Sequence, residues 1–161
     1  VTIGDTMYWD TLRQYFEIKQ GMIKAKRQGG FDSLGIDTWG VDFGLLDEDG
    51  RLLESAVHYR DSRTAGIPEE VFKAVPKEEV YQLTGNSFES FNTIFQLYAL
   101  VQKRPELLKR AASLLLTPDL FNYFLTGTKR AEYTMATTTQ LMDAKNKIWS
   151  ERIIDGLGIP K

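Results

Sequence analysis

The sequence contains no cysteine, so it can form neither a disulfide framework nor a thiolate metal site. Its only histidine is His58, and the acidic residues lack the spacing of metal ligands, so we predict no metal-binding residues. No apolar run approaches the roughly 20 residues of a membrane span, so we expect no membrane partner. The lack of cysteine is also typical of a reducing compartment, and we expect a cytoplasmic protein.

The sequence also lacks a basic stripe. The 20 basic and 22 acidic residues are interspersed along the 161-residue chain, which carries a net charge of -2. Neutralising the phosphates of a nucleic acid requires clustered Lys and Arg, so we expect no nucleic-acid partner. The nucleotide-binding patterns GxGxxG and GxxxxGK[ST] are absent as well, and Gly127-Thr128-Lys129 has no glycine loop before it.

Hydrophobic residues make up 42% of the chain, which is enough for the core of one domain or of a piece of a larger one. Apolar residues between Leu12 and Ala25 recur every three or four positions and predict a helix. Asp10 or Thr11 would cap its start, and Gly29-Gly30 would end it.

Three short strands are predicted next. Residues 33–38 and 41–46 are the first two, and residues 51–59 form the third. The acidic turn Asp47-Glu48-Asp49-Gly50 is typical of a hairpin, so we expect the third strand to pair with the second.

Helices dominate the second half. Pro68 and Pro76 stand where a first helical turn tolerates proline, and each is followed by a pair of glutamates that suits a helix N-terminus. The class is therefore α/β or α+β, with a small mixed sheet and a helix-rich second half. Further helices are predicted over 94–101, 105–112, 117–126 and 149–157, and residues 114–116 form a strand or an extended link.

Several stretches occur in an order and at a spacing that one protein family shares. Together they cover the chain from about Met7 to its end. The stretches are Ser33–Phe43, Tyr59–Thr64, Phe91–Thr93, Pro118–Asp119 with Leu125–Gly127, and Glu132–Thr134 with Ala136–Leu141.

In these stretches the chain resembles the N-terminal domain of the FGGY carbohydrate kinases. The segments Asp37–Phe43 and Ala136–Gln140 favour the branch of the family that phosphorylates L-rhamnulose over the xylulose and glycerol kinases. The resemblance implies a partial actin-like (ribonuclease H-like) α/β fold. In the complete enzyme it implies two domains with ATP and Mg²⁺ in the cleft between them, and phosphate transfer to the 1-hydroxyl of the sugar.

The resemblance also implies that parts of the enzyme lie outside this chain. The first strand, whose Asp-x-Gly turn faces the ATP phosphates, would precede Val1, which is not an initiator methionine. The catalytic aspartate and the nucleotide domain would follow Lys161. We therefore expect residues 1–161 to form the sugar-binding side of an N-terminal domain. Alone, this piece should contain no catalytic or cofactor-binding residues, bind ATP and Mg²⁺ only weakly and show no kinase activity.

The corner Asp37-Thr38-Trp39-Gly40 is the main candidate for sugar binding. A flat indole offers an apolar wall to the methyl group and ring carbons of a deoxy sugar, and a glycine lets a backbone N–H approach a sugar oxygen. The alternative is that Gly40 serves the turn and Trp39 fills the core. The resemblance favours the sugar role for Gly40 and leaves both interpretations open for Trp39.

Phe91 and Asn92 are the second candidate pair. The resemblance places a ring and an amide near the sugar at this point, whereas the residue types alone indicate a hydrophobic staple and a helix N-cap. Three other polar residues have structural interpretations. Asp61 pairs with Arg63 or caps backbone amides, Asp119 is a carboxylate in the first turn of a helix, and His58 is a satisfied strand residue.

Two rival functions remain. The chain could be a sugar-binding or assembly module without catalysis, or part of an FGGY kinase for another ketose or polyol. A partial actin-like domain would also expose apolar surface, so self-association through the open sheet edge is expected.

Overall fold

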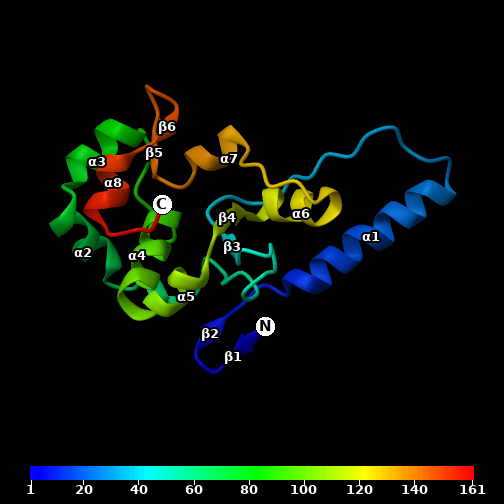
Figure 1. Cartoon of the computed structure of the whole chain (residues 1–161), viewed down its shortest axis with the longest axis horizontal. Coiled ribbons are helices and arrows are strands. Elements are labelled where there is room, and N and C mark those ends of the chain that lie inside the picture. The colour runs from blue at the N-terminus through cyan, green and yellow to red at the C-terminus, as the bar shows by residue number, and fades with distance from the viewer.

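The computed structural model describes residues 1–161, and its longest helix, α1 (Thr11–Arg27), projects from the body of the molecule (Figure 1). The helix begins as predicted, because the Asp10 carboxylate accepts a hydrogen bond from the N–H of Arg13 at 3.1 Å. After it, Gly29 and Gly30 adopt φ angles of 125° and 84° that favour glycine. Thr11 is the only buried residue of α1, so most of the helix lies outside the core.

The strands form three separate antiparallel pairs. The β1 (Thr2–Ile3) and β2 (Thr6–Met7) strands pair near the N-terminus. In the centre, β3 (Phe43–Leu46) pairs with β4 (Ser113–Leu116). The third pair joins β5 (Met142–Asp143) to β6 (Ile148–Trp149). The mixed helix and sheet content agrees with the predicted class.

One strand prediction is wrong, and another holds only at its start. Residues 33–38 are irregular, because no neighbouring strand lies beside them to complete a hydrogen-bonded ladder. Residues 51–59 pair with β3 only at their start. The Leu46–Leu52 bridge and the hydrogen bond from the N–H of Leu53 to the carbonyl of Leu45 at 2.9 Å belong to the predicted hairpin. In addition, β3 pairs along its whole length with the distant β4, and all four of its residues are buried.

The predicted helices of the second half are confirmed. They are α2 (Ile67–Ala74), α3 (Lys77–Thr84), α4 (Thr93–Lys103), α5 (Pro105–Arg110), α6 (Thr117–Thr126) and α8 (Glu151–Gly156). Gly85 and Gly127 end α3 and α6 with φ angles of 71° each, in the left-handed region that glycine favours. The short helix α7 (Tyr133–Thr137) and the 3-10 turn η1 (Ser62–Thr64) were not predicted.

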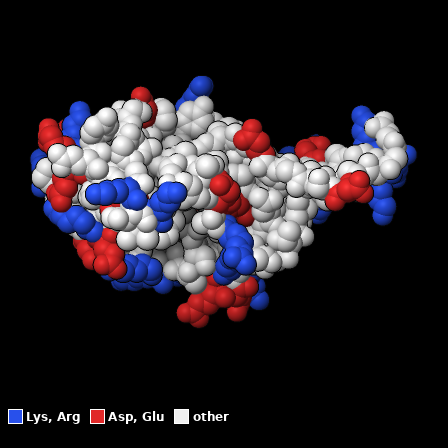
Figure 2. Space-filling model, turned by 90° about the horizontal axis from the view of Figure 1, so that it is seen from above, with Lys and Arg blue, Asp and Glu red and all other residues white.

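The core is built around α4, which contacts α2, α5 and η1. Ile94 and Phe95 of α4 are 0% and 1% exposed, and burial of such side chains stabilises a fold by about 1.5–3 kcal/mol each. A smaller cluster of Leu46, Leu115 and Leu120 packs α6 against β3 and β4. Basic and acidic side chains alternate over the face shown in Figure 2. None of the helices is long and apolar enough to cross a membrane.

Gly44 in β3 provides a test of this packing. A Cβ atom there would stand 2.7 Å from Leu120 Cδ2 and 2.9 Å from Leu52 Cδ1, and Leu120 is fully buried. Gly44→Ala should therefore lower the free energy of unfolding in urea by about 1–3 kcal/mol. The matched control is Gly35→Ala, since a Cβ at Gly35 would meet nothing within 4 Å. Equal stabilities of the two variants would contradict the close packing of α6 on β3.

Candidate sugar-binding site

The corner after Trp39 is a tight γ-turn. Val41 has a φ of 70°, and the N–H of Asp42 donates to the carbonyl of Gly40 at 2.9 Å. A β-branched residue in this region costs on the order of 1–3 kcal/mol, so the surrounding structure must hold it. The γ-turn turns the chain directly from the corner into β3.

Side chains from two helical segments hold the γ-turn. The Thr93 hydroxyl at the start of α4 donates to the Val41 carbonyl at 2.7 Å, and Gln96 Nε2 donates to the same oxygen at 3.3 Å. The N–H of Val41 donates to the hydroxyl of Thr138, which follows α7, at 3.4 Å. These contacts offset the strain of the positive φ angle.

Beneath the γ-turn, the carboxylate of Asp42 is fully buried and accepts four hydrogen bonds. Its Oδ2 atom accepts from the indole N–H groups of Trp9 at 2.6 Å and Trp39 at 3.0 Å, and from the backbone N–H of Tyr59 at 3.1 Å. Its Oδ1 atom accepts from Gln96 Nε2 at 3.1 Å. A buried charge is tolerated only with such partners, and each bond to it contributes about 1.5–3 kcal/mol.

Four half-buried aromatic rings form a continuous surface, which we call the aromatic wall: Trp39, Trp9, Tyr59 and Phe91. The ring centroids lie 4.2 Å apart between Trp39 and Trp9, 6.4 Å between Trp9 and Tyr59, and 5.6 Å between Tyr59 and Phe91. The structure thus joins the two predicted rings, Trp39 and Phe91, through two rings that sequence reasoning did not select. Tyr59 stood within one of the family-like stretches, whereas Trp9 carried no local signal beyond its place before a helix cap.

Gly40 is placed at a close contact. A Cβ atom at this position would lie 3.0 Å from the hydroxyl oxygen of Thr138 and 3.2 Å from its Cβ, which explains why a glycine fits here. The N–H of Gly40 donates to no acceptor within the chain. Gly40 therefore serves the close packing of the corner and also carries an unused backbone donor next to Trp39.

Asn92 is largely committed to internal contacts. It occupies the N-cap position of α4, but its side chain does not cap the helix. Instead, Nδ2 donates to the carbonyl of Ser87 at 3.0 Å and to Oε1 of Gln140 at 2.8 Å. Because both protons of the amide nitrogen have acceptors inside the chain, only the carbonyl oxygen of the side chain could contact a ligand.

The charged bend after Tyr59 has structural contacts. Asp61 accepts from the N–H groups of Arg63 at 2.9 Å and Met7 at 2.7 Å, so the capping interpretation is confirmed. The Arg63 guanidinium instead donates to Oε1 of Gln96. The ring of His58 stacks on Trp9, Nδ1 accepts the N–H of Arg60 at 3.0 Å, and burial lowers the pKa of this imidazole. His58 therefore has a hydrogen-bond partner, as predicted, although it lies outside the strands.

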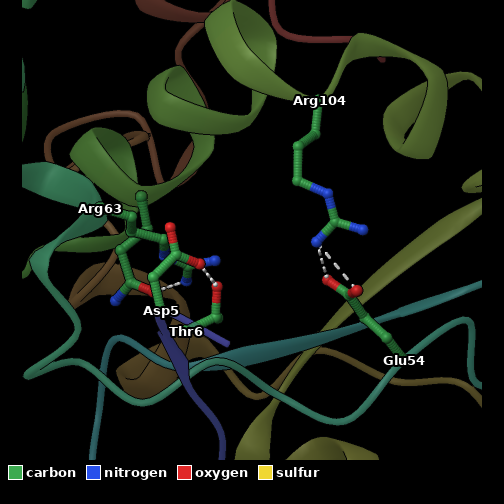
Figure 3. A network of polar contacts seen from close by, with 6 residues as sticks. Asp5, Thr6, Glu54, Arg63 and Arg104 are labelled. Carbon is green, nitrogen blue, oxygen red and sulfur yellow. Dashed lines mark hydrogen bonds and ion pairs between the residues drawn. The ribbon is translucent and has the colours of Figure 1, made fainter. Parts of the chain in front are cut away.

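A pocket of about 210 Å³ lies beside this bend, and Figure 3 shows part of its polar lining. Its cations already have acceptors. Lys103 donates to the carbonyl of Arg63 at 3.1 Å, and Arg104 pairs with both carboxylate oxygens of Glu54 at 2.9 Å. The cations that line this pocket are therefore held by acceptors within the chain. The chain holds no group of three or more His, Asp or Glu residues that could bind a metal ion.

Asp119 stands in the first turn of α6, as predicted, and is 4% exposed. Burial raises the pKa of its carboxyl above the ordinary value of 3.8, although the N–H of Glu132 donates to it at 3.2 Å and counteracts the rise. The folded state then holds the proton more tightly than the unfolded chain does. Stability contributed by this group is present at low pH and falls as the pH rises past the unfolded-state value towards the folded pKa.

Asp119→Asn should abolish this loss, because a neutral amide has no charge to desolvate. Urea unfolding from about pH 3 to about pH 7 should show the variant gaining stability relative to the unmodified chain as the pH rises. Asp143→Asn is the control of opposite sign, because hydrogen bonds from Asn146 lower the pKa of Asp143. That variant should lose relative stability over the same range. Parallel curves for Asp119→Asn and the unmodified chain would refute the raised pKa.

Comparisons with known proteins agree on one family. Residues 10–161 match the family model described as the N-terminal domain of the FGGY family of carbohydrate kinases. The chain is 51% identical to a rhamnulokinase of Halalkalibacterium halodurans, with 93% of this chain and 32% of the relative covered. It is 48% identical to a rhamnulokinase of Oceanobacillus iheyensis, with coverage of 98% and 34%. The chain therefore spans about a third of the length of these relatives.

Solved structures share the fold at low sequence identity. The xylulose kinase of Lactobacillus acidophilus matches with a TM-score of 0.86 and 19% identity, over 100% of this chain and 33% of that protein. The glycerol kinase of Plasmodium falciparum matches with a TM-score of 0.75 and 20% identity, over 99% and 34%. The likeness confirms the predicted fold, that of sugar kinases with an actin-like architecture.

Proposed function

The chain belongs to the FGGY family of carbohydrate kinases, and from this premise we propose that it forms the sugar-binding side of a longer kinase. That kinase transfers phosphate from ATP to the 1-hydroxyl of L-rhamnulose. The proposal for the sugar is supported by the relatives named rhamnulokinase, which are 43–51% identical to this chain.

The observation that carries the proposal is the aromatic wall next to the unused N–H of Gly40. L-Rhamnulose is a 6-deoxy sugar, so it presents both a methyl group and hydroxyl groups. Half-buried rings suit the methyl group and the C–H faces of such a ligand, and a backbone N–H suits one of its oxygens. Trp39 would supply the ring nearest to Gly40, and Phe91 the opposite end of the wall. Asn92 would contribute at most the carbonyl oxygen of its side chain.

The phosphate-transfer machinery is proposed to lie outside residues 1–161. Phosphoryl transfer depends on positioned phosphates and on neutralisation of their charge. The pocket beside the charged bend has cations that are already paired, and no group of residues suits Mg²⁺. We therefore propose that the phosphate-binding turn precedes Val1 and that the catalytic aspartate and nucleotide domain follow Lys161. The 161-residue chain alone is expected to turn over no ATP.

A second candidate substrate has specific support. The structural neighbours include several xylulose kinases, and the TM-score of one reaches 0.86, so the fold accommodates other ketoses.

Self-association and a cytoplasmic location stay predictions. The chain exposes apolar side chains on α1, where Leu12, Phe16 and Ile23 are 64%, 45% and 44% exposed, whereas the predicted contact is the open sheet edge.

Trp39→Ala in the full-length kinase tests the sugar site. Loss of an aromatic contact worth about 0.5–1.5 kcal/mol should raise the KM for L-rhamnulose between about twofold and about tenfold. The KM for ATP should stay unchanged. Trp149→Ala is the matched control, because this indole lies in the β5–β6 hairpin and is 43% exposed.

The same assays with xylulose separate the two candidate sugars. A site that selects the 6-deoxy sugar should lose more activity towards L-rhamnulose than towards xylulose when the indole is removed. An unchanged KM for L-rhamnulose in Trp39→Ala, or an equal rise in Trp149→Ala, would contradict the proposed site.

A further inference from the structure

We propose that the buried carboxylate of Asp42 is a positioning residue, which orients the aromatic wall and the Gly40 corner for the sugar. This inference rests on the proposed function. Asp42 is fully buried and contacts the surface only through other residues, so it would act on the ligand indirectly. The contacts of its side chain and of its backbone support the proposal independently.

The first support is the convergence of two indole groups on one atom. The N–H groups of Trp9 and Trp39 both donate to Oδ2 of Asp42, at 2.6 and 3.0 Å. An indole has a single hydrogen-bond donor, so each bond determines which edge of the ring points inward. The opposite edges then face outward, with the two rings tilted by 33°. Without this common acceptor, neither half-buried ring would have a polar contact that sets its orientation.

The second support is that both side-chain oxygen atoms of Asp42 must accept hydrogen bonds. Oδ1 of Asp42 accepts from Gln96 Nε2, and the amide of Gln96 cannot rotate to offer its oxygen instead. Its Oε1 atom accepts from the Arg63 guanidinium, while Nε2 also donates to the carbonyl of Phe91 at 2.7 Å. An asparagine at position 42 would therefore direct its NH₂ group at a donor, either Gln96 or the indoles.

The third support is the backbone of Asp42. Its carbonyl accepts from both the N–H and the hydroxyl of Thr117, at 3.0 and 3.1 Å. Its N–H donates to the carbonyl of Gly40 and closes the γ-turn. Asp42 thus bonds to α6 through its carbonyl, and it bonds to both parts of the proposed sugar surface, the rings and the glycine corner.

The test is Asp42→Asn in the full-length kinase. The KM for L-rhamnulose should rise by about tenfold, which corresponds to ~1.4 kcal/mol, with the KM for ATP unchanged. Acrylamide should also quench tryptophan fluorescence more strongly, because the two indoles lose a shared acceptor. Asp119→Asn is the matched control, since it removes another buried carboxylate that contacts none of the rings of the wall. An unchanged sugar KM in Asp42→Asn would overturn the inference, as would an equal rise in the control.

A second variant keeps the test decisive if Asp42→Asn does not fold. Trp39→Phe retains a ring but removes the N–H that donates to Asp42. The KM for L-rhamnulose should rise in this variant by at least about threefold. Where Asp42→Asn does fold, the double variant should show less than additive effects, because both changes remove the same contact. A sugar KM in Trp39→Phe equal to that of the unmodified kinase would overturn the inference.

The two proposals fail in different ways. If Trp39→Ala leaves the KM for L-rhamnulose unchanged, the aromatic wall is not the sugar site and the proposed function fails. If Trp39→Ala raises this KM but Asp42→Asn and Trp39→Phe do not, the wall binds the sugar and only the positioning role of Asp42 is refuted.

Discussion

The carboxylate of Asp42 accepts hydrogen bonds from residues 9, 39, 59 and 96, which belong to distant parts of the chain. Burying this charge is costly, and the four donors offset the cost only when all of them are in place. The segment before α1, the corner before β3, the charged bend and α4 therefore have to meet at one point. The aromatic wall and the strained γ-turn both depend on these hydrogen bonds. The proposed sugar surface and the centre of the fold therefore depend on the same buried carboxylate.

Much of the fold could be predicted because its signals are local. Asp10 and Gly29-Gly30 bound α1, and Gly127 ends α6, each through contacts within a few residues of the chain. The corner at Trp39 and Gly40 was selected by its similarity to a family and by residue chemistry. Both residues are half-buried in the structure.

The rest depends on contacts between distant residues. The pairing of β3 with β4 joins segments about 70 residues apart, and the local hairpin signal after β3 gave no indication of this second partner. The positive φ of Val41 runs against the preference of a β-branched residue, so no local pattern could indicate it. The indole N–H of Trp9 donates to Asp42, and an isolated aspartate next to a strand carries no signal of that role.

A crystal structure of the full-length kinase with L-rhamnulose would test the central claim most directly. A sugar oxygen should lie within hydrogen-bonding distance of the Gly40 N–H, with the carbons of the sugar in contact with the Trp39 ring. The indole N–H groups of Trp9 and Trp39 should still donate to Asp42. A sugar bound without contact to either Gly40 or the aromatic wall would contradict the account.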